Sequence, residues 1–331
     1  MEKIEGRSFS RSGLFRKTGL FLFILMCVSV LSLYVGPAGT DFGIIMRVRL
    51  PRVVLGIIVG GTLAMSGAVF QGVLRNPLAD PYILGTSTGG ALGASVGLIL
   101  LGSSGVVSSL VIPILAFSGS FLTTIIVYLM SRRGGRVPRE TLLLSGVIVG
   151  TLFGAIIMFL MTWAEKELHE ILYVLMGYLG MIWTGETLYM VVMVTAMVIA
   201  GGFLIYYHAR DLNLLSLGEE QAFSLGVDVE RTKLYLFFSA SLITGSVVSL
   251  SGLIGFVGLV VPHIVRMALG TDNRILIPAS FLAGSTLLIV SDTVARSLFI
   301  QEIPVGVVTA LFGTPFFIYL LRREGKTEAR G

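Results

Sequence analysis

Long apolar segments, separated by short polar or glycine-rich stretches, recur along the whole chain. An α-helix rises about 1.5 Å per residue, so about 20 apolar residues cross the roughly 30 Å hydrocarbon layer of a bilayer. Apart from closed barrels, only helices satisfy their own backbone hydrogen bonds in that layer. The pattern predicts membrane-spanning helices at residues 19–35, 53–73, 83–101, 106–130, 141–163, 187–207, 275–295 and 304–321.

Two further apolar stretches do not have the length of one span. Residues 234–269 carry no acidic or basic side chain before Arg266, and a single helix of that length would measure roughly 54 Å. We therefore expect two spans there, with a break near residues 251–255, which brings the total to about ten. Residues 171–183 are too few for a crossing and are typical of a re-entrant or interfacial helix.

The positions of lysine and arginine favour one orientation of these ten spans. Five of the 24 basic residues lie on one side of the membrane, and the remaining 19 lie on the side of the N-terminus. Because cytoplasmic loops are rich in Lys and Arg, we expect both ends of the chain (residues 1–18 and 322–331) and the long loop of residues 208–233 to be cytoplasmic. The five basic residues on the other side are Arg47, Arg49, Arg52, Lys166 and Arg296.

The composition agrees with a membrane protein. The 331 residues are 54% hydrophobic and only 13% charged, with a mean hydropathy of +0.91, whereas soluble domains are about 25% charged. We therefore expect one transmembrane domain over residues 1–331, in contact with the lipid bilayer. The net charge of +5 follows from the cytoplasmic loops and does not indicate nucleic-acid binding. Cys27, the single cysteine, is expected to be a small buried hydrophobic residue.

Glycine recurs at every fourth position within three of the predicted spans, which places it along one face of each helix. Such faces allow helix backbones to approach closely in lipid. We therefore expect these residues to lie in helix contacts. They are Gly56 and Gly60; Gly89, Gly93 and Gly97; and Gly146, Gly150 and Gly154.

Few side chains are candidates for chemistry. The three histidines have no second ligand at metal-site spacing, so we expect no metal site. The acidic residues cluster at span ends, with Asp292 the deepest, and form no obvious proton relay of the kind that ion-coupled transporters keep in the bundle. Residues 325–327 lack the earlier glycine of a phosphate-binding loop. The chain is therefore expected to bind no cofactor, and to be a passive pore or to obtain energy from another subunit.

The loop of residues 208–233 contains a short amphipathic segment bounded by glycines. It is either a solvated surface helix or a peg that fits a groove on a soluble partner, and its pattern leaves both open. Ala222 is small enough to allow close approach of a partner, and we expect Gly226 to end the helix with a positive φ angle. The residues singled out are Gly218, Glu219, Glu220, Gln221, Ala222, Leu225 and Gly226.

Several motifs occur in an order that resembles the FecCD family, the permeases of importers for ferric siderophores, haem and cobalamin. The matches cover nearly the whole chain. The motifs are RLPR at residues 49–52, GAVFQ at 67–71, RNPLADP at 75–81, NLLSLGEEQA at 213–222, GFVGLVVPH at 255–263 and PVGVVTALFGTPFF at 304–317.

The resemblance implies an all-α polytopic protein like the permeases of type II ABC importers, with an inverted repeat of spans 2–5 and 7–10. It implies a homodimer with the pathway at the dimer interface, an extracytoplasmic binding protein, and two cytoplasmic ATPases that carry the ATP and Mg²⁺, in the inner membrane. The permease itself would catalyse no covalent reaction. We expect a ferric siderophore as cargo, with haem, cobalamin or an oxyanion as alternatives, and an ion-coupled transporter acting without an ATPase as the alternative function.

The resemblance also implies roles for single residues. The segment of residues 218–226 would be the coupling helix seated on the ATPase. Arg49, Arg52 and Arg296 would face acidic residues of the binding protein, with attachment to lipid phosphates as the alternative. Two further groups are assigned to the cytoplasmic gate and to the short helix near the outer mouth, with plain packing as the alternative for both: Leu144, Ser145 and Gly146; and Met176 and Gly177.

Overall fold

The computed structural model describes residues 11–37, 39–102, 105–134, 137–181, 183–298 and 302–328, and every element within these ranges is a helix. Six of the described helices are long and apolar enough to cross a membrane, and four shorter apolar helices complete the predicted ten. The elements are α1 (Arg11–Tyr34), α2 (Phe42–Ile44), a π-helical turn (Ile45–Arg49), α3 (Leu50–Leu74), α4 (Thr86–Leu101), α5 (Val106–Ser131), α6 (Arg139–Met161), α7 (Leu168–Met176), α8 (Gly185–Tyr207), α9 (Ala209–Leu217), α10 (Glu219–Ser224), α11 (Val229–Ser251), α12 (Val257–Leu269), α13 (Asn273–Ser297) and α14 (Val305–Glu328).

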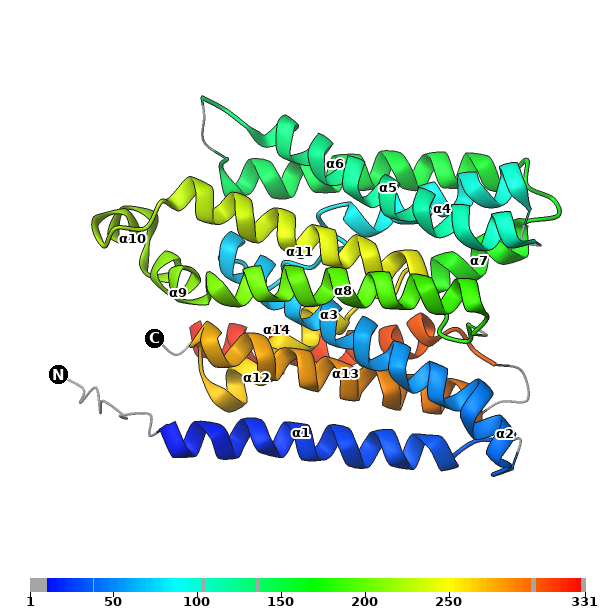
Figure 1. Cartoon of the computed structure of the whole chain (residues 1–331). Helices are drawn as coiled ribbons and strands as arrows, with labels where there is room; N and C mark the ends of the chain where they lie inside the picture. The colour runs from blue at the N-terminus through cyan, green and yellow to red at the C-terminus, as the bar shows by residue number, and fades with distance from the viewer. Residues whose placement is uncertain are drawn as a thin grey trace.

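The spans run roughly antiparallel in one bundle (Figure 1). α1 begins and α14 ends at the same end of the bundle, where α9 and α10 also lie; we call it the α10 end. The opposite end carries α2 and α7, and we call it the α7 end. α7 has nine residues, so the prediction that residues 171–183 do not form an eleventh span is confirmed.

The predicted break within residues 234–269 is also confirmed. α11 ends at Ser251, residues 252–256 are not helical, and α12 begins at Val257. Gly252 and Phe256 both have a φ angle of 67°, in the left-handed region that few residues other than glycine adopt. The chain therefore turns sharply at each end of the break, and α12 is left with only 13 residues.

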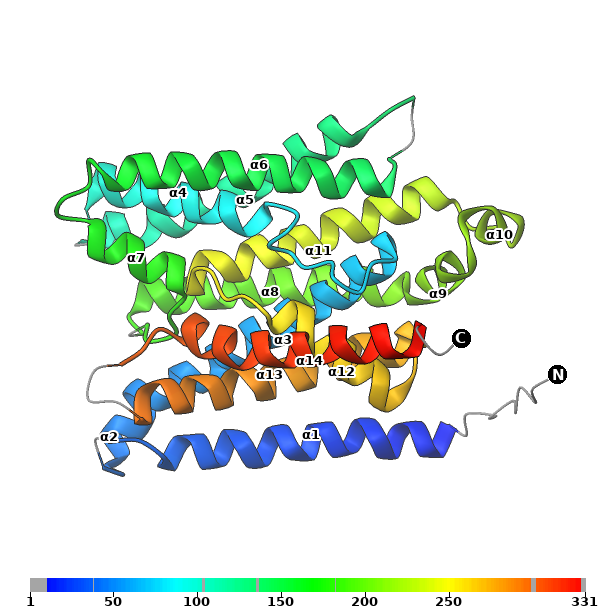
Figure 2. The ribbon, with the colours of Figure 1, turned by 180° about the vertical axis from the view of Figure 1, so that it is seen from behind.

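A second interruption, residues 75–85, separates α3 from α4. Each half of the bundle thus contains a long helix, a non-helical stretch, a short helix and two long helices: α3 to α6 in the first half and α11 to α14 in the second. The two halves run in opposite directions through the bundle (Figure 1, Figure 2). This arrangement is the predicted inverted repeat.

Glycine brings several of these helices into backbone contact. A methyl group at Gly60 would overlap the backbone of α13, and one at Gly67 would overlap the backbone of α12. Gly89 and Gly93 lie equally close to α5, so the predicted packing role holds for α3 and α4. The series on α6 differs, because a methyl group at Gly154 would meet no other described atom within 4 Å.

α1 lies at the periphery of the bundle, against α13 (Figure 1). Its Leu25 packs with Val53 and Ile289 in a small separate core. Cys27 is exposed, so the expectation of a buried cysteine is wrong. The reason is that α1 buries only one narrow face, and Cys27 lies outside that face.

Candidate functional site

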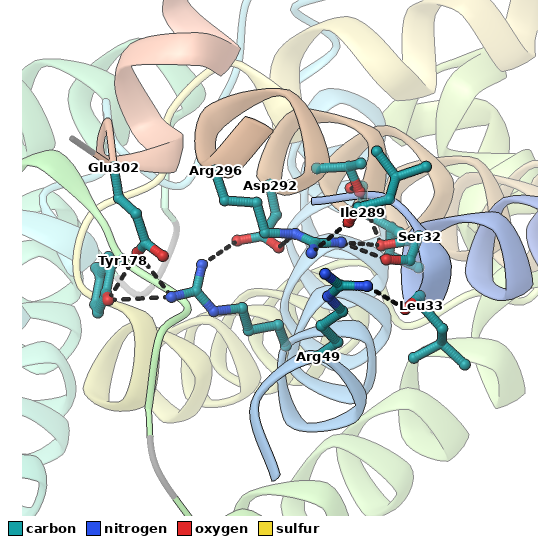
Figure 3. Close-up of polar contacts among 11 residues, drawn as sticks. Ser32, Leu33, Arg49, Tyr178, Ile289, Asp292, Arg296 and Glu302 are labelled. Atoms are coloured by element: carbon teal, nitrogen blue, oxygen red, sulfur yellow. Dashed lines mark hydrogen bonds and ion pairs between the residues drawn. The ribbon is translucent and has the colours of Figure 1, made fainter. Parts of the chain in front are cut away.

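Three arginines meet at the α7 end, as Figure 3 shows. Arg52 at the start of α3 and Arg296 at the end of α13 share the carboxylate of Asp292, at 3.7 Å from Arg52 Nη1 and 3.3 Å from Arg296 Nε. Arg52 Nη2 also donates to Glu302 at 2.7 Å and to the Tyr178 hydroxyl at 3.2 Å. Arg52 therefore joins α3 to α13, to the segment before α14 and to the segment after α7.

Arg49 and Arg296 donate hydrogen bonds to backbone carbonyl oxygens at and just after the end of α1. Arg49 donates to Leu33 O at 2.9 Å and to Gly39 O at 2.5 Å, and Arg296 donates to Val35 O at 2.7 Å. The last carbonyls of a helix have no partner within the helix, and cations stabilise that end. All three arginines, Arg52 included, are buried in this subunit, which differs from the exposure expected of residues that face a binding protein or lipid phosphates.

The two interrupted segments and α14 line a cavity of about 790 Å³. Figure 2 shows these two segments between α6 and α14 on one face of the bundle. The lining of the cavity is almost entirely apolar, with one carboxylate, Asp80, whose Oδ1 accepts from the Tyr82 backbone N–H at 3.0 Å. The walls come from the first interrupted segment, the end of α7, the second interrupted segment with the start of α12, and α14: Asp80, Tyr82 and Ile83; Leu175 and Met176; Leu253, Gly255, Phe256 and Leu259; and Gly306, Val307, Ala310, Leu311, Thr314 and Pro315.

The structure places the two residues predicted near the outer mouth at this cavity. Met176 lines it, and Gly177 has a φ angle of 71° and packs against the backbone of Leu253. A side chain at position 177 would collide with that backbone, so the fold requires glycine there. The sequence did not reveal the other walls, because they come from three segments far apart in the chain.

Of the three residues predicted to form a gate, Gly146 lies beside the same cavity. A methyl group at Gly146 would be 2.7 Å from Ile83 O and from Leu84 Cα, so α6 touches the first interrupted segment through its backbone. Ser145 is buried, and Leu144 is exposed on the outer face of α6. Only Gly146 therefore touches the cavity wall within this subunit.

The amphipathic segment predicted at residues 218–226 forms α10 and the turn after it, and α10 projects beyond the bundle (Figure 1). The preceding helix, α9, packs against α3 and α13. Gly226 has a φ angle of 88° after the end of α10, as predicted. Ala222 is fully buried in a small core with Leu215 and Val227, so the expectation that it faces a partner is corrected. The exposed apolar side chain of α10 is Phe223, which was not among the residues expected to contact a partner.

Glu219 connects α10 to two spans. Its Oε1 lies 2.6 Å from Arg139 Nη2 on α6, and its Oε2 lies 2.8 Å from Lys233 Nζ on α11. Burial opposes ionisation of Glu219, but the Lys233 ammonium and the Arg139 guanidinium outweigh burial and hold the pKa of its carboxyl below the ordinary value. Among the described residues, no three His, Cys, Asp or Glu side chains gather as a metal site would require.

Comparisons with known proteins agree with this geometry. The profile of the FecCD transport family matches residues 20–323. The cobalamin import system permease protein BtuC of Halobacterium salinarum is 47% identical over 84% of this chain and 73% of its own length. The hemin transport system permease protein HmuU of Yersinia pestis is 40% identical over 84% of this chain and 83% of its own length.

Solved structures share the fold. A protein assigned to the metal-chelate type of ABC transporter, in an inward-facing conformation, has a TM-score of 0.82 and 32% identity over 93% of this chain and 99% of that one. PsaBC of Streptococcus pneumoniae, at 17% identity and a TM-score of 0.56, shares the fold alone. The chain therefore belongs to the FecCD transport family and is a multi-pass membrane permease of the ABC importer type.

Proposed function

We propose that this chain is the membrane subunit of an ATP-driven importer for a metal chelate of the tetrapyrrole class, such as cobalamin or haem. The observation that carries the proposal is the apolar surface on α9 and α10, beyond the spans. Leu217, Phe223 and Leu225 are 63%, 74% and 59% exposed there. Apolar side chains gathered outside the bilayer mark an interaction surface.

The partner at this surface is a cytoplasmic ATPase. A short amphipathic helix fits an apolar groove on a soluble protein, and this chain has no phosphate-binding loop of its own. ATP and Mg²⁺ would be held by the partner, and this chain would bind no cofactor. The bias of lysine and arginine supports a cytoplasmic α10 end.

The face that holds the cavity is the surface for a second copy of the chain. The cavity is open on that face, and Leu311 on α14 lines it. Leu311 is exposed. Two copies related by a twofold axis would close the two cavities into one pathway at their interface. Access to this pathway would alternate between the two sides of the membrane as the ATPases bind and release ATP.

The α7 end would receive the extracytoplasmic binding protein. The three arginines Arg49, Arg52 and Arg296 carry one positive charge more than the nearby carboxylates of Asp292 and Glu302 neutralise. This net positive charge would attract acidic groups to the surface above the cluster. All three arginines are buried in this subunit, so they would act on a docked partner through their net charge and not through direct contact.

The cargo proposal rests on chemistry and on relatives. The cavity is apolar with a single carboxylate, Asp80, so it favours a large apolar chelate and disfavours an oxyanion, which the carboxylate would repel. The relatives named above are described as permeases for cobalamin and hemin, both metal tetrapyrroles. A ferric siderophore, the cargo expected from the sequence, is the second candidate, since a structural relative is of the metal-chelate type.

The alternative of an ion-coupled carrier has less support. Such carriers use carboxylates that change protonation deep in the bundle. The deepest carboxylate predicted here, Asp292, forms ion pairs with Arg52 and Arg296. In this arrangement it joins α13 to α3.

The test is uptake into liposomes that contain the permease with its ATPase and binding protein. We expect ATP-dependent uptake of cyanocobalamin or hemin, and none with an ATPase variant that does not hydrolyse ATP. Uptake driven by an ion gradient without ATP would refute the importer. ATP-driven uptake of a ferric siderophore alone would refute the tetrapyrrole cargo and leave the importer standing.

A further inference from the structure

The start of α6 is fastened to the coupling segment, defined here as α9 and α10. Arg139 is the first residue of α6 and Glu219 the first residue of α10, and their side chains meet at 2.6 Å. The other carboxylate oxygen of Glu219 holds Lys233, which is buried on α11. Glu219 is thus fixed on both sides.

A second contact fastens the same place. The backbone N–H of Val137, just before α6, donates to Glu230 Oε2 at 3.2 Å, and the other oxygen of Glu230 accepts from Lys233 at 3.2 Å. The start of α6 is therefore held to α10 and α11 by acidic and basic side chains, outside the apolar part of the bundle.

Two turns further on, the same helix reaches the cavity. Gly146 follows Arg139 by roughly 10 Å along the helix axis, and its backbone lies against Ile83 and Leu84 with no room for a methyl group. Ile83 lines the cavity. A displacement of the start of α6 is therefore passed to the cavity wall through a backbone contact that has no slack.

We propose that the Arg139–Glu219 ion pair transmits movement of the coupling segment through the first two turns of α6 to the cavity wall at Ile83. Rigid helices and ion pairs in contiguous contact carry coupling between distant sites. Arg139 and Glu219 act as positioning residues, since neither touches nucleotide or cargo. This inference rests on the proposed function, because it assumes that an ATPase moves the coupling segment.

The reporter is the reactivity of a cysteine in the cavity wall. Ile83→Cys, with the native Cys27 replaced by serine, is labelled with a water-soluble maleimide in nanodiscs that hold the permease and its ATPase, with and without ATP and vanadate. The nucleotide-dependent ratio of labelling rates measures how far the ATPase controls the wall. No cargo is needed, so its identity does not affect the result.

The variants form a cycle: Arg139→Gln, Glu219→Gln and the two together. We expect each single change to reduce the nucleotide-dependent ratio by about 2- to 30-fold. The double change should do no more than Glu219→Gln alone, because Arg139→Gln removes only a link that Glu219→Gln has already removed. The matched control is the exposed pair Asp228–Arg231 in the same loop, at 3.2 Å. Asp228→Asn and Arg231→Gln should leave the ratio unchanged.

Each result decides between the two proposals. If the reporter background shows no response to nucleotide, the proposed ATP-driven function fails. If the background responds and the glutamine variants respond equally, or their losses add, the transmission role of the ion pair is refuted while the proposed function stands. Loss of ATPase binding in the single variants would also refute it, because the pair would then be holding the docking surface.

Discussion

Truncation of Phe223 to alanine tests the docking surface most directly. A phenylalanine buries about 150–250 Å² in an interface, and 74% of this one is still exposed, which leaves roughly 110–185 Å² for a partner to cover. At about 25 cal/mol per Å² this burial is worth up to about 3–5 kcal/mol. Desolvation of polar groups and ordering of side chains on binding reduce this gain. We therefore expect Phe223→Ala to weaken the binding free energy by about 2–3 kcal/mol, which raises the dissociation constant for the ATPase about 30- to 160-fold.

The assay is equilibrium binding of the purified ATPase to the permease in nanodiscs. Phe203→Ala is the matched control, because Phe203 is 69% exposed on the membrane-spanning surface of α8. The thermal unfolding midpoint should be unchanged in both variants, since neither side chain is in the core. Equal affinities for the Phe223 variant and the wild type would refute the view that α10 enters a groove on the partner.

Three further predictions concern packing, orientation and pH. Gly67→Ala should lower the free energy of unfolding by about 1–3 kcal/mol, measured by thermal unfolding in detergent, because the added methyl overlaps the backbone of α12, whereas Gly154→Ala should be neutral. Cysteines at Glu167 and at Gly134, in a background without the native cysteine, should react with an impermeant maleimide from opposite sides; labelling of both from one side would contradict the cytoplasmic α10 end. The pKa of Glu219 lies below its ordinary value of 4.5, so its ion pairs stabilise α10 fully above about pH 4.5, and this contribution is lost as the pH falls through the lowered pKa. Hydrogen exchange of α10 amides, corrected for the intrinsic rate, should therefore increase on acidification, and Glu219→Gln should already show the increased exchange at neutral pH.

The spans were predictable because membrane thickness, charge and length restrict the chain strongly. The break after Ser251 followed from a stretch too long for one crossing, and residues 171–183 were recognised as too short. Both conclusions depend on local sequence alone. The inverted repeat followed from the family resemblance. The two short helices, α4 and α12, occupy equivalent positions in its two halves.

The internal roles of the arginines could not be predicted in this way. The sequence places Arg49 and Arg296 at span ends, where exposure is the ordinary expectation, but it does not show that the carbonyls at the end of α1 lie within reach. Ala222 and Phe223 illustrate the same limit at short range. A six-residue helix has too few turns for its pattern to reveal which side is buried, and the core with Leu215 and Val227 decides it.

The arginine contacts at the end of α1 also bear on the order in which the protein is assembled. Ser32 and Arg296, whose side chains meet at 2.9 Å, are separated by 264 residues. Synthesis at about 5–20 residues per second puts the two on the order of tens of seconds apart. α1 therefore lies in the bilayer for that time without α13, and until α13 emerges it contacts only lipid and the start of α3, through residues such as Arg49 and Val53. The exposed apolar side chains of α1, among them Leu20, Phe23 and Met26, suit a helix that contacts lipid over most of its surface before the bundle is complete.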